Sequence, residues 1–382
     1  MARIYLDHAA TTTVRPEVVA AMVPLLGAGY NPSSLHAEGR AAREAVDAAR
    51  ATVADLLGAS PREIVFTASG SEADTLAIVG TARALRDRGR HVVTSAIEHP
   101  AVLQAVDLLE REGWSVTRLP VDRRGLVDPH VFAAALTPDT TLATIALANN
   151  EIGVVEPVAE LAALARTRGV RFHTDAIQVP GWLPLDVRSL GIDLLALSAH
   201  KFGGPMGVGA LYVRAGTPVE PQILGGSQEH GLRAGTENVA GIVGFARALA
   251  LAEAERAEGA PRVAALRDRL EAGIRATIPD VLINGAGAPR LPGILSVAFA
   301  DAPSEALLIR LDLDGIAASV GSACAAGSLE PSHVAAALGL DARHLSGVIR
   351  FSLGRATTGS EVEEVLARLP ALVAGIRSPL IV

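Results

Sequence analysis

The sequence predicts an α/β fold with a mainly parallel central sheet, helices on both faces of that sheet, and a smaller α+β domain. Three observations carry this prediction. Before Asn238, short apolar runs alternate with helical patterns. The connections between most of these runs are long enough for the helical crossovers that parallel strands require. After Asn238, two long charged helical segments lead into a shorter stretch of mixed elements.

The large sheet should contain seven strands, separated by helices. Right-handed crossovers would gather the carboxyl ends of these strands at one edge, where α/β sheets bind ligands. The clearest helical patterns are Glu72–Arg88, Pro100–Glu112 and Pro157–Arg168. The expected strands are Glu63–Thr67, His91–Ser95, Ser115–Leu119, Thr141–Ala146, Arg171–Thr174, Leu194–Leu197 and Gly209–Val213.

The remainder of the chain should form the smaller domain. Helical patterns run from about Asn238 to Ile278, and a final helix is expected near Ser360–Gly375. Two further strands, Ile294–Ala298 and Val348–Ser352, are expected between them. We therefore assign residues 12–250 to a large cofactor-binding domain. Residues 1–11 and 251–382 form a small α+β domain that carries the cysteine loop described below.

The composition narrows the class of protein. Of the 382 residues, 49% are hydrophobic and 20% are charged, so a large core is expected. The net charge of −7 argues against nucleic-acid or anionic-membrane partners. The single cysteine excludes an intrachain disulfide and fits a reducing cytoplasm. We expect no signal peptide and no membrane span, because the most apolar helical stretch, Val239–Ala252, is short and contains Arg247.

Two residue types occur once each, and both bear on chemistry. Lys201 is the one lysine among 34 lysines and arginines, and it follows Ser198 and His200. An arginine could not replace it in a Schiff base, because a guanidinium stays protonated and is a poor nucleophile. Cys324 lies in a run of small residues, Gly321–Ser328, that would let its sulfur move. The alternatives are an accidental lysine in an arginine-rich chain and a cysteine that is only a small buried hydrophobe.

The first strand-end motifs suggest an anion site and a ring contact. Phe66–Glu72 reads as a strand, a turn of small residues and a helix start, so free N–H groups and the Ser71 hydroxyl could bind an anion. An ordinary serine N-cap is the alternative. His99 follows the next strand and precedes a helix. It is either a structural histidine or a ring that stacks on a planar cofactor.

Two further strand ends supply a carboxylate and an amine. Asp175 ends a strand in an apolar wall, where a carboxylate is costly without a cationic partner such as a protonated pyridine nitrogen. It could instead cap the next turn. Ser198 and His200 are candidate phosphate donors beside the amine of Lys201. Lysine, aspartate and a phosphate-binding helix start are together the groups that pyridoxal 5′-phosphate needs.

Longer motifs that resemble those of a known family are spread over nearly the whole chain. The first is Tyr5–Thr12 and the last is Ile349–Arg355. The motifs between them are Asn31–Ser34, Glu98–Val102, Asn149–Gly153, Asp175–Gln178, Ser198–Lys201, Arg233–Thr236 and Gly321–Cys324. On these motifs the sequence resembles the cysteine desulfurases of the class-V aminotransferase superfamily. The resemblance implies the fold of pyridoxal-phosphate-dependent transferases, which is like that of aspartate aminotransferase.

The resemblance also implies roles around pyridoxal phosphate. Lys201 would form the Schiff base, and His99 would stack on the pyridine ring and assist proton movement. Asp175 would bind the ring nitrogen and Gln178 the phenolic oxygen, with Asn150 beside cofactor and substrate. The residues implied for the phosphate are Gly70, Ser71, Ser198 and His200.

Two further roles concern the partner subunit and the substrate. Thr236 would reach the phosphate of the other subunit, which implies a homodimer with shared active sites. Arg350 would clamp the substrate carboxylate, since a planar guanidinium binds both oxygens at once. A surface salt bridge is the alternative for Arg350, although its place within an apolar strand pattern argues against that.

The implied activity is conversion of L-cysteine to L-alanine, with the sulfur transferred to Cys324 as a persulfide and no metal at the site. An acceptor protein, with an iron–sulfur scaffold as one candidate, would then receive the sulfur. A selenocysteine lyase, a cysteine sulfinate desulfinase, an aminotransferase and a non-catalytic sulfur-relay or cofactor-binding protein remain alternatives. The chain departs from the family pattern at Ser71, Thr75 and Val320, where threonine, asparagine and serine are common.

Overall fold

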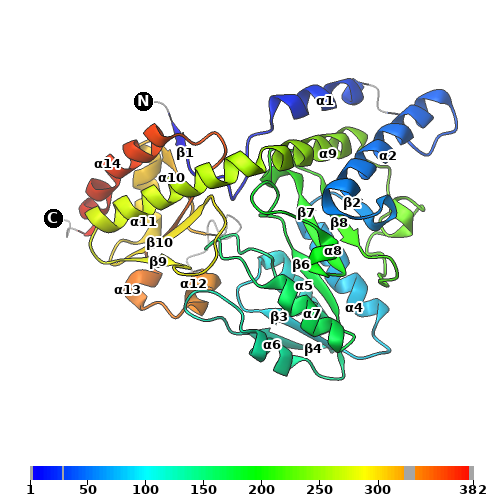
Figure 1. Ribbon diagram of the computed structural model, residues 1–382, viewed down its shortest axis with the longest axis horizontal. Coiled ribbons are helices and arrows are strands. Elements are labelled where there is room, and N and C mark those ends of the chain that lie inside the picture. Colours follow the sequence, from blue (N-terminus) through cyan, green and yellow to red (C-terminus); the bar gives the residue numbers. More distant parts are fainter. Residues whose placement is uncertain (1–2, 28–29, 322–331, 378–382) are drawn as a thin grey trace.

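The computed structural model describes residues 3–27, 30–321 and 332–377. A large sheet with its helices occupies one side of the molecule, and a smaller group of strands and helices occupies the other (Figure 1). The long helix α10 (Arg256–Thr277) crosses the smaller part and extends toward the large part (Figure 1). Cys324, the predicted sulfur acceptor, lies outside the described residues. Within the described residues, no helix combines the length and the apolar character needed to cross a bilayer.

The large sheet has seven strands and is mainly parallel, as predicted. Five neighbouring strands, from β7 to β4, run parallel to one another, whereas β8 runs antiparallel to both β7 and β2. The reversal at β8 has a simple cause. Only residues 199–208 join β7 to β8, which is too short for a parallel crossover. The spatial order is β2 (Ile64–Thr67), β8 (Gly209–Val213), β7 (Leu194–Ser198), β6 (Arg171–Asp175), β5 (Thr140–Thr144), β3 (His91–Ser95) and β4 (Ser115–Leu119).

Both faces of this sheet are covered, and the side-chain alternation of the strands divides them. Leu195 and Leu197 of β7 belong to one apolar cluster, whereas Leu194 and Ala196 belong to another. The same division separates Ile64 and Phe66 from the Val65 between them. Because successive side chains of a strand point to opposite faces, strands buried on both faces are apolar at almost every position.

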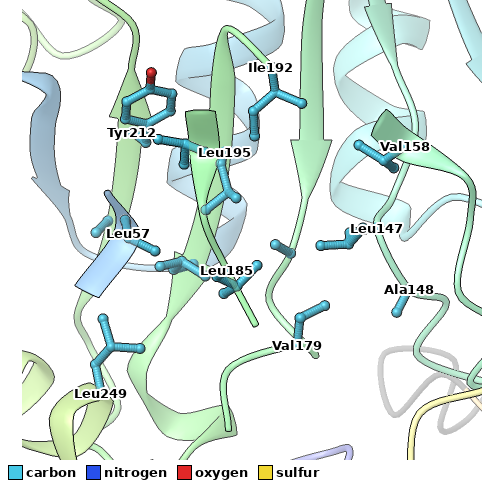
Figure 2. Close-up of a cluster of buried hydrophobic side chains, with 14 of the residues drawn as sticks. Leu57, Leu147, Ala148, Val158, Val179, Leu185, Ile192, Leu195, Tyr212 and Leu249 are labelled. Atoms are coloured by element: carbon cyan, nitrogen blue, oxygen red, sulfur yellow. The ribbon is translucent and has the colours of Figure 1, made fainter. Parts of the chain in front are cut away.

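Helices on the two faces complete these clusters. Figure 2 shows part of the larger cluster, in which Leu57 of α2 and Leu249 of α9 join the strand residues Leu195 and Tyr212. That face is covered by α2 (Ala37–Leu57), α6 (Pro129–Ala135), α7 (Val158–Thr167) and α9 (Val239–Ala254), while α1 (Pro16–Gly27) packs on α9 and α8 (Val187–Leu190) on α7. The other face is covered by α3 (Gly70–Thr75), the π-helical turn Leu76–Gly80, α4 (Thr81–Ala84) and α5 (Pro100–Arg111).

The smaller part has its own apolar core. That core contains residues from Val263 to Val373 together with Ile4 and Leu6 near the N-terminus. The division of the chain into domains near residue 250 stays a prediction. The smaller part has three antiparallel strands, β9 (Val281–Asn284), β10 (Ile294–Phe299) and β12 (Val348–Ser352). It also has the parallel pair β1 (Ile4–Tyr5) and β11 (Ile316–Ala317). Its helices are α10, α11 (Ser304–Leu313), α12 (His333–Ala337), α13 (Ala342–Leu345) and α14 (Gly359–Arg377).

Several expected elements have slightly different bounds in the structure, and two of the differences have a clear physical cause. The strand expected to end at Ala146 ends at Thr144, and the Ala146 amide donates to the Glu98 carboxylate at 3.0 and 3.1 Å instead. The single helix expected over Glu72–Arg88 is divided by a π-helical turn and ends at Ala84. At that turn Gly80 approaches the backbone of Glu220 so closely that an added Cβ would lie 2.6 Å from its carbonyl oxygen.

Candidate active site

A cavity of about 430 Å³ opens at the carboxyl ends of the sheet strands. Asp175 ends β6, Ser198 ends β7, and His99 follows β3, so the sheet brings all three to this edge. The predicted site residues that line it are Gly70, Ser71, His99, Asn150, Asp175, Gln178, Ser198, His200, Lys201 and Arg350. Thr236 is exposed and lies outside the cavity lining, and Cys324 lies outside the described residues.

Lys201 is held at the edge of the sheet by the turn that follows β7. Its Nζ donates to the carbonyl oxygens of Ala9 and Ala10, at 2.6 and 2.8 Å. The N-terminal segment is fixed here because the Thr12 amide donates to the His200 carbonyl at 2.9 Å. Residues distant in sequence therefore set the position of the amine.

The start of α3 forms a small-residue wall of the cavity. Ser69 is the N-cap, and its hydroxyl accepts the Glu72 amide at 3.1 Å. An added Cβ on Gly70 would lie 2.2 Å from Cδ1 of Ile177 and 3.2 Å from Cβ of Ser198. The serine N-cap is therefore Ser69, which leaves the Ser71 hydroxyl at the cavity wall.

Asp175 is buried at the base of the cavity. Burial raises its pKa to about 6, although a hydrogen bond from the Ile177 amide and the charge of Lys201 lower it. The Ile177 amide donates to Oδ1 at 2.8 Å, so the carboxylate does cap the next turn, as the alternative interpretation held. Burial outweighs this hydrogen bond and the charge of Lys201, so the net effect raises the pKa of the carboxyl group.

Both histidines of the cavity are neutral near pH 7. Burial, together with the positive charge of Lys201, lowers the pKa of His99 to about 4, and that of His200 to about 4. Nδ1 of His99 accepts the Ala101 amide at 3.1 Å, so the neutral ring carries its hydrogen on Nε2. His99 is thus the N-cap of α5 and also a wall of the cavity.

Arg350 is a buried guanidinium. It is 1% exposed, which excludes the surface salt bridge considered for it. Nη2 donates to Asp7 Oδ1 at 2.8 Å, and Nη1 donates to the Asn150 carbonyl at 2.9 Å. Its Nε is buried without a hydrogen-bond partner in the described structure, so one edge of the fork has a donor to spare. Opposite, Gln178 Nε2 donates to the Ala9 carbonyl at 3.0 Å.

Comparison with known proteins identifies the family. The model for "Aminotransferase class-V" matches residues 4–365. A protein of Dictyoglomus turgidum named "Cysteine desulfurase IscS" is 46% identical, with 98% of this chain and 95% of that protein covered. The "Cysteine desulfurase NifS" of Azotobacter vinelandii is 45% identical over 99% of this chain and 94% of its own. This chain belongs to the cysteine desulfurase family of class-V aminotransferases.

A solved structure supports the same family assignment for this chain. A protein described as "NIFS-LIKE PROTEIN" superposes with a TM-score of 0.92 and is 36% identical. The match covers 98% of this chain and all of the other. The predicted transferase fold and the predicted family are therefore confirmed.

Sequence reasoning missed a group of buried carboxylates behind the cavity. Asp74 is fully buried, neither of its oxygens has a hydrogen-bond partner in the described structure, and His173 Nε2 lies 3.6 Å away. One ligand-type atom each of Asp74, His99 and Asp175 lie within 4.8 Å of one another. Burial, with the charges of Asp175 and Glu98, holds the pKa of Asp74 well above its usual value.

Glu98 belongs to the same group. Burial raises its pKa to about 8, although the Ser95 hydroxyl and the Ala146 amide donate to it. Burial also lowers the pKa of His173 to about 3. At pH 7, Glu98 is thus mainly protonated and His173 is mainly neutral. An acidic residue in an otherwise apolar helix pattern, as at Asp74, was the available sequence signal.

Proposed function

We propose that this cysteine desulfurase binds pyridoxal 5′-phosphate in the cavity and converts L-cysteine to L-alanine, with Cys324 as the sulfur acceptor. The observation that supports this most directly is the placement of Lys201, Asp175 and His99 around one cavity at the carboxyl edge of the sheet. An amine, a buried carboxylate and a flat neutral ring are the groups that a pyridine aldehyde requires.

The cavity fits this cofactor in three respects. The lack of a side chain at Gly70 lets the start of α3 pack directly against Ile177 and Ser198, which brings its backbone to the cavity wall. Asp175 has a raised pKa, which a cationic ring nitrogen beside it would lower. The hydroxyl groups of Ser71 and Ser198 line the same cavity and are suited to a phosphate.

The proposed contacts are those that the family resemblance implies, and the cavity lining supports them. Lys201 would bind the aldehyde carbon, Asp175 the ring nitrogen, and Gln178 the phenolic oxygen. His99 would contact the ring. The residues proposed to hold the phosphate are Gly70, Ser71, Ser198 and His200. When bound, pyridoxal phosphate supplies an electron sink that stabilises negative charge at the Cα of an amino acid.

Asn150 and Arg350 orient the substrate in this proposal. The Arg350 fork is already aligned by Asp7 and by the Asn150 carbonyl, so little side-chain freedom is lost when a carboxylate joins it. Lys201 is the proposed base for the Cα proton, because its amine belongs to the cavity wall.

Sulfur transfer requires the thiolate of Cys324. The thiolate attacks the sulfur of the substrate, and a sulfur–sulfur bond forms as the carbon–sulfur bond breaks. The carbon fragment keeps the electron pair of that bond, takes up a proton and leaves as L-alanine. Cys324 then carries the extra sulfur as a persulfide, which a thiol reductant or an acceptor protein removes.

Product analysis tests this function. Purified protein reconstituted with pyridoxal phosphate should release L-alanine from L-cysteine, and the Cys324 peptide should gain one sulfur atom by mass spectrometry. Cys324→Ala should lose L-cysteine turnover. If that variant still acts on selenocysteine or cysteine sulfinate at the parental rate while the parent shows no persulfide, the lyase alternatives replace the proposal. A keto-acid product would indicate an aminotransferase.

A homodimer with shared sites is part of the proposal. Thr236 is exposed, and nearby Ala234 donates its amide to Ile223 at 3.2 Å. Ile223 and Leu224 are 42% and 79% exposed, and Met206 at the cavity mouth is 68% exposed. Such an apolar rim is typical of a subunit interface. Sedimentation equilibrium should give a dimer, and Leu224→Asp should shift it toward monomer.

The sulfur is proposed to pass to an acceptor protein in the cytoplasm, with iron–sulfur cluster assembly as the leading use. A reducing compartment would keep the single thiol available for each cycle. Transfer of labelled sulfur from Cys324 to a purified iron–sulfur scaffold, compared with transfer to a sulfur carrier for tRNA thiolation, would distinguish the acceptors.

A further inference from the structure

A second cavity lies at the opposite edge of the large sheet. It has a volume of about 350 Å³ and is lined by Arg88, Arg166, Gly169, Val170, Arg171, Asp193 and Arg214. Its position follows from the strand directions, because β6 begins at Arg171, β7 begins just after Asp193, and the antiparallel β8 ends just before Arg214. The two cavities are therefore separated by the length of the strands.

Four arginines from four separate segments meet at this cavity. Arg88 lies in the turn after α4, Arg166 on α7, Arg171 on β6 and Arg214 after β8. Residues so far apart in the sequence are brought together only by the fold. Such a concentration of positive charge is notable in a chain with a net charge of −7.

The lining contains one carboxylate, that of Asp193, and it is already engaged. Asp193 is 6% exposed, and its Oδ2 accepts the Phe172 amide at 2.9 Å. Its Oδ1 accepts Arg171 Nη1 at 2.9 Å, and Arg214 Nη1 lies 3.9 Å from the same atom. One carboxylate beside four guanidinium groups leaves an excess of three positive charges in the lining.

Helix capping explains part of this cluster. Arg88 donates to the Gly169 carbonyl at 3.1 Å, and Arg166 lies in the last turn of α7, where a cation is favourable. Capping does not explain Arg171 and Arg214. The Nε of Arg171 is buried and has no hydrogen-bond partner in the described structure, so the fold does not satisfy every donor of this guanidinium.

We propose that this cavity is a binding site for a compact phosphate polyanion of the inorganic pyrophosphate class. Guanidinium groups present planar pairs of donors that match the oxygens of phosphate. The lining has no aromatic side chain on which a nucleobase could stack. The chemistry of the site therefore favours the phosphates themselves over a nucleoside. This site does not depend on the proposed desulfurase activity.

Titration calorimetry on the cofactor-loaded protein is the direct test. With cofactor bound, the phosphate-binding residues proposed at the other edge are occupied, so pyrophosphate should report on the arginine cavity. We expect saturable binding of pyrophosphate, at least about tenfold weaker binding of orthophosphate, and ATP no tighter than pyrophosphate. ATP binding more than tenfold tighter than pyrophosphate would overturn the assignment to a compact polyanion.

Substitutions of single arginines test whether pyrophosphate binds at this cavity. Arg166→Ala and Arg214→Ala should each weaken pyrophosphate about tenfold, because each removes a charge-assisted contact. Arg62→Ala removes an exposed arginine that does not line the cavity and should leave the affinity unchanged. Equal affinities in all three variants, or no binding to the parent protein at low salt, would overturn the proposal.

A folding control accompanies these measurements. The melting temperature of the parent should rise with pyrophosphate, since a ligand that binds the folded state stabilises it. That rise should shrink in Arg166→Ala and Arg214→Ala but not in Arg62→Ala. A rise of the same size in every variant would place the binding elsewhere on the protein and contradict the proposal.

Discussion

The two cavities of the large sheet differ in the ionisable side chains that surround them. At the carboxyl edge, Asp74, Glu98 and Asp175 all have raised pKa values because they are buried. At the amino edge, arginines surround the single carboxylate of Asp193. A carboxyl group deprived of water can take up a proton, but a guanidinium keeps its charge. Protonation can therefore change the charge at the carboxyl edge, whereas the guanidinium groups at the amino edge stay charged.

Replacement of Lys201 should give the largest effect and would test the carboxyl edge most severely. Lys201→Ala should lower L-cysteine turnover by at least about 10³-fold, because both the amine and the proposed base are lost. Lys201→Arg keeps the positive charge but should not restore activity, because a guanidinium cannot form a Schiff base. Turnover and visible absorption are measured together. Parental activity in Lys201→Arg would show that charge alone is needed there.

Arg350→Lys should give the next largest effect, which is on the KM for L-cysteine. An ammonium cannot contact Asp7, the Asn150 carbonyl and a substrate carboxylate with the geometry of a fork, so KM for L-cysteine should rise about 10- to 100-fold. The measurement is steady-state kinetics with a melting curve as the folding control. If KM is unchanged while the melting temperature falls, Arg350 serves the N-terminal segment rather than the substrate.

Asp193→Asn tests the amino edge by removing its one carboxylate. An asparagine oxygen can still accept the Phe172 amide, so the strand contact is kept. Pyrophosphate should bind several-fold and up to about tenfold more tightly, because a repulsive charge is lost and two arginines are released. Calorimetry against the parent is the check. Weaker binding would mean that Asp193 is needed to position the arginines.

Glu98→Gln should give the smallest effect, in the pH dependence of stability. The pKa of Glu98 is raised from 4.5 to about 8, so the folded state binds more protons than the unfolded state between these values. The free energy of unfolding therefore falls as pH rises through this window. Histidines with lowered pKa values act in the opposite direction only below about pH 6.5.

Urea unfolding of the cofactor-free protein at pH 7 and pH 8 measures this effect. Glu98→Gln should lose less stability than the parent over this interval, by about 1 kcal/mol. Glu110→Gln, at an exposed carboxylate whose pKa is lowered by its hydrogen bond to Arg118, is the matched control and should behave like the parent. An unchanged slope in Glu98→Gln would show that Glu98 is not the group responsible for the pH dependence.

The sequence predicted the position of a site residue where a residue suited to chemistry lies at or just after the end of an expected strand. Lys201, Asp175 and His99 each follow an apolar run, so their common edge could be predicted from the order of residues alone. The reversal of β8 could also have been predicted, because the ten residues before it are too few for a crossover. Its apolar pattern alone does not distinguish parallel from antiparallel pairing.

Other features of the structure could not be predicted from sequence patterns, and the reasons are physical. Arg88, Arg166, Arg171 and Arg214 each look like an ordinary solvated arginine, and only tertiary packing brings them together. The oxygens that accept from Lys201 belong to the backbone of Ala9 and Ala10, and backbone groups have no residue-specific signal. The Ala146 amide was expected to belong to a strand but donates to the Glu98 carboxylate instead, and this side chain is likewise distant in sequence.

The N-terminal segment has a consequence for biosynthesis. Asp7 contacts Arg350, 343 positions later, and β1 pairs with β11 near residue 316, while Ala9 and Ala10 accept from Lys201. Residues 7–10 must therefore wait until Arg350 has been synthesised before the wall around the amine can close. Contacts of such long sequence separation form late, because they require closure of a long loop. A nascent chain would assemble its sheet well before it acquired a competent reaction centre.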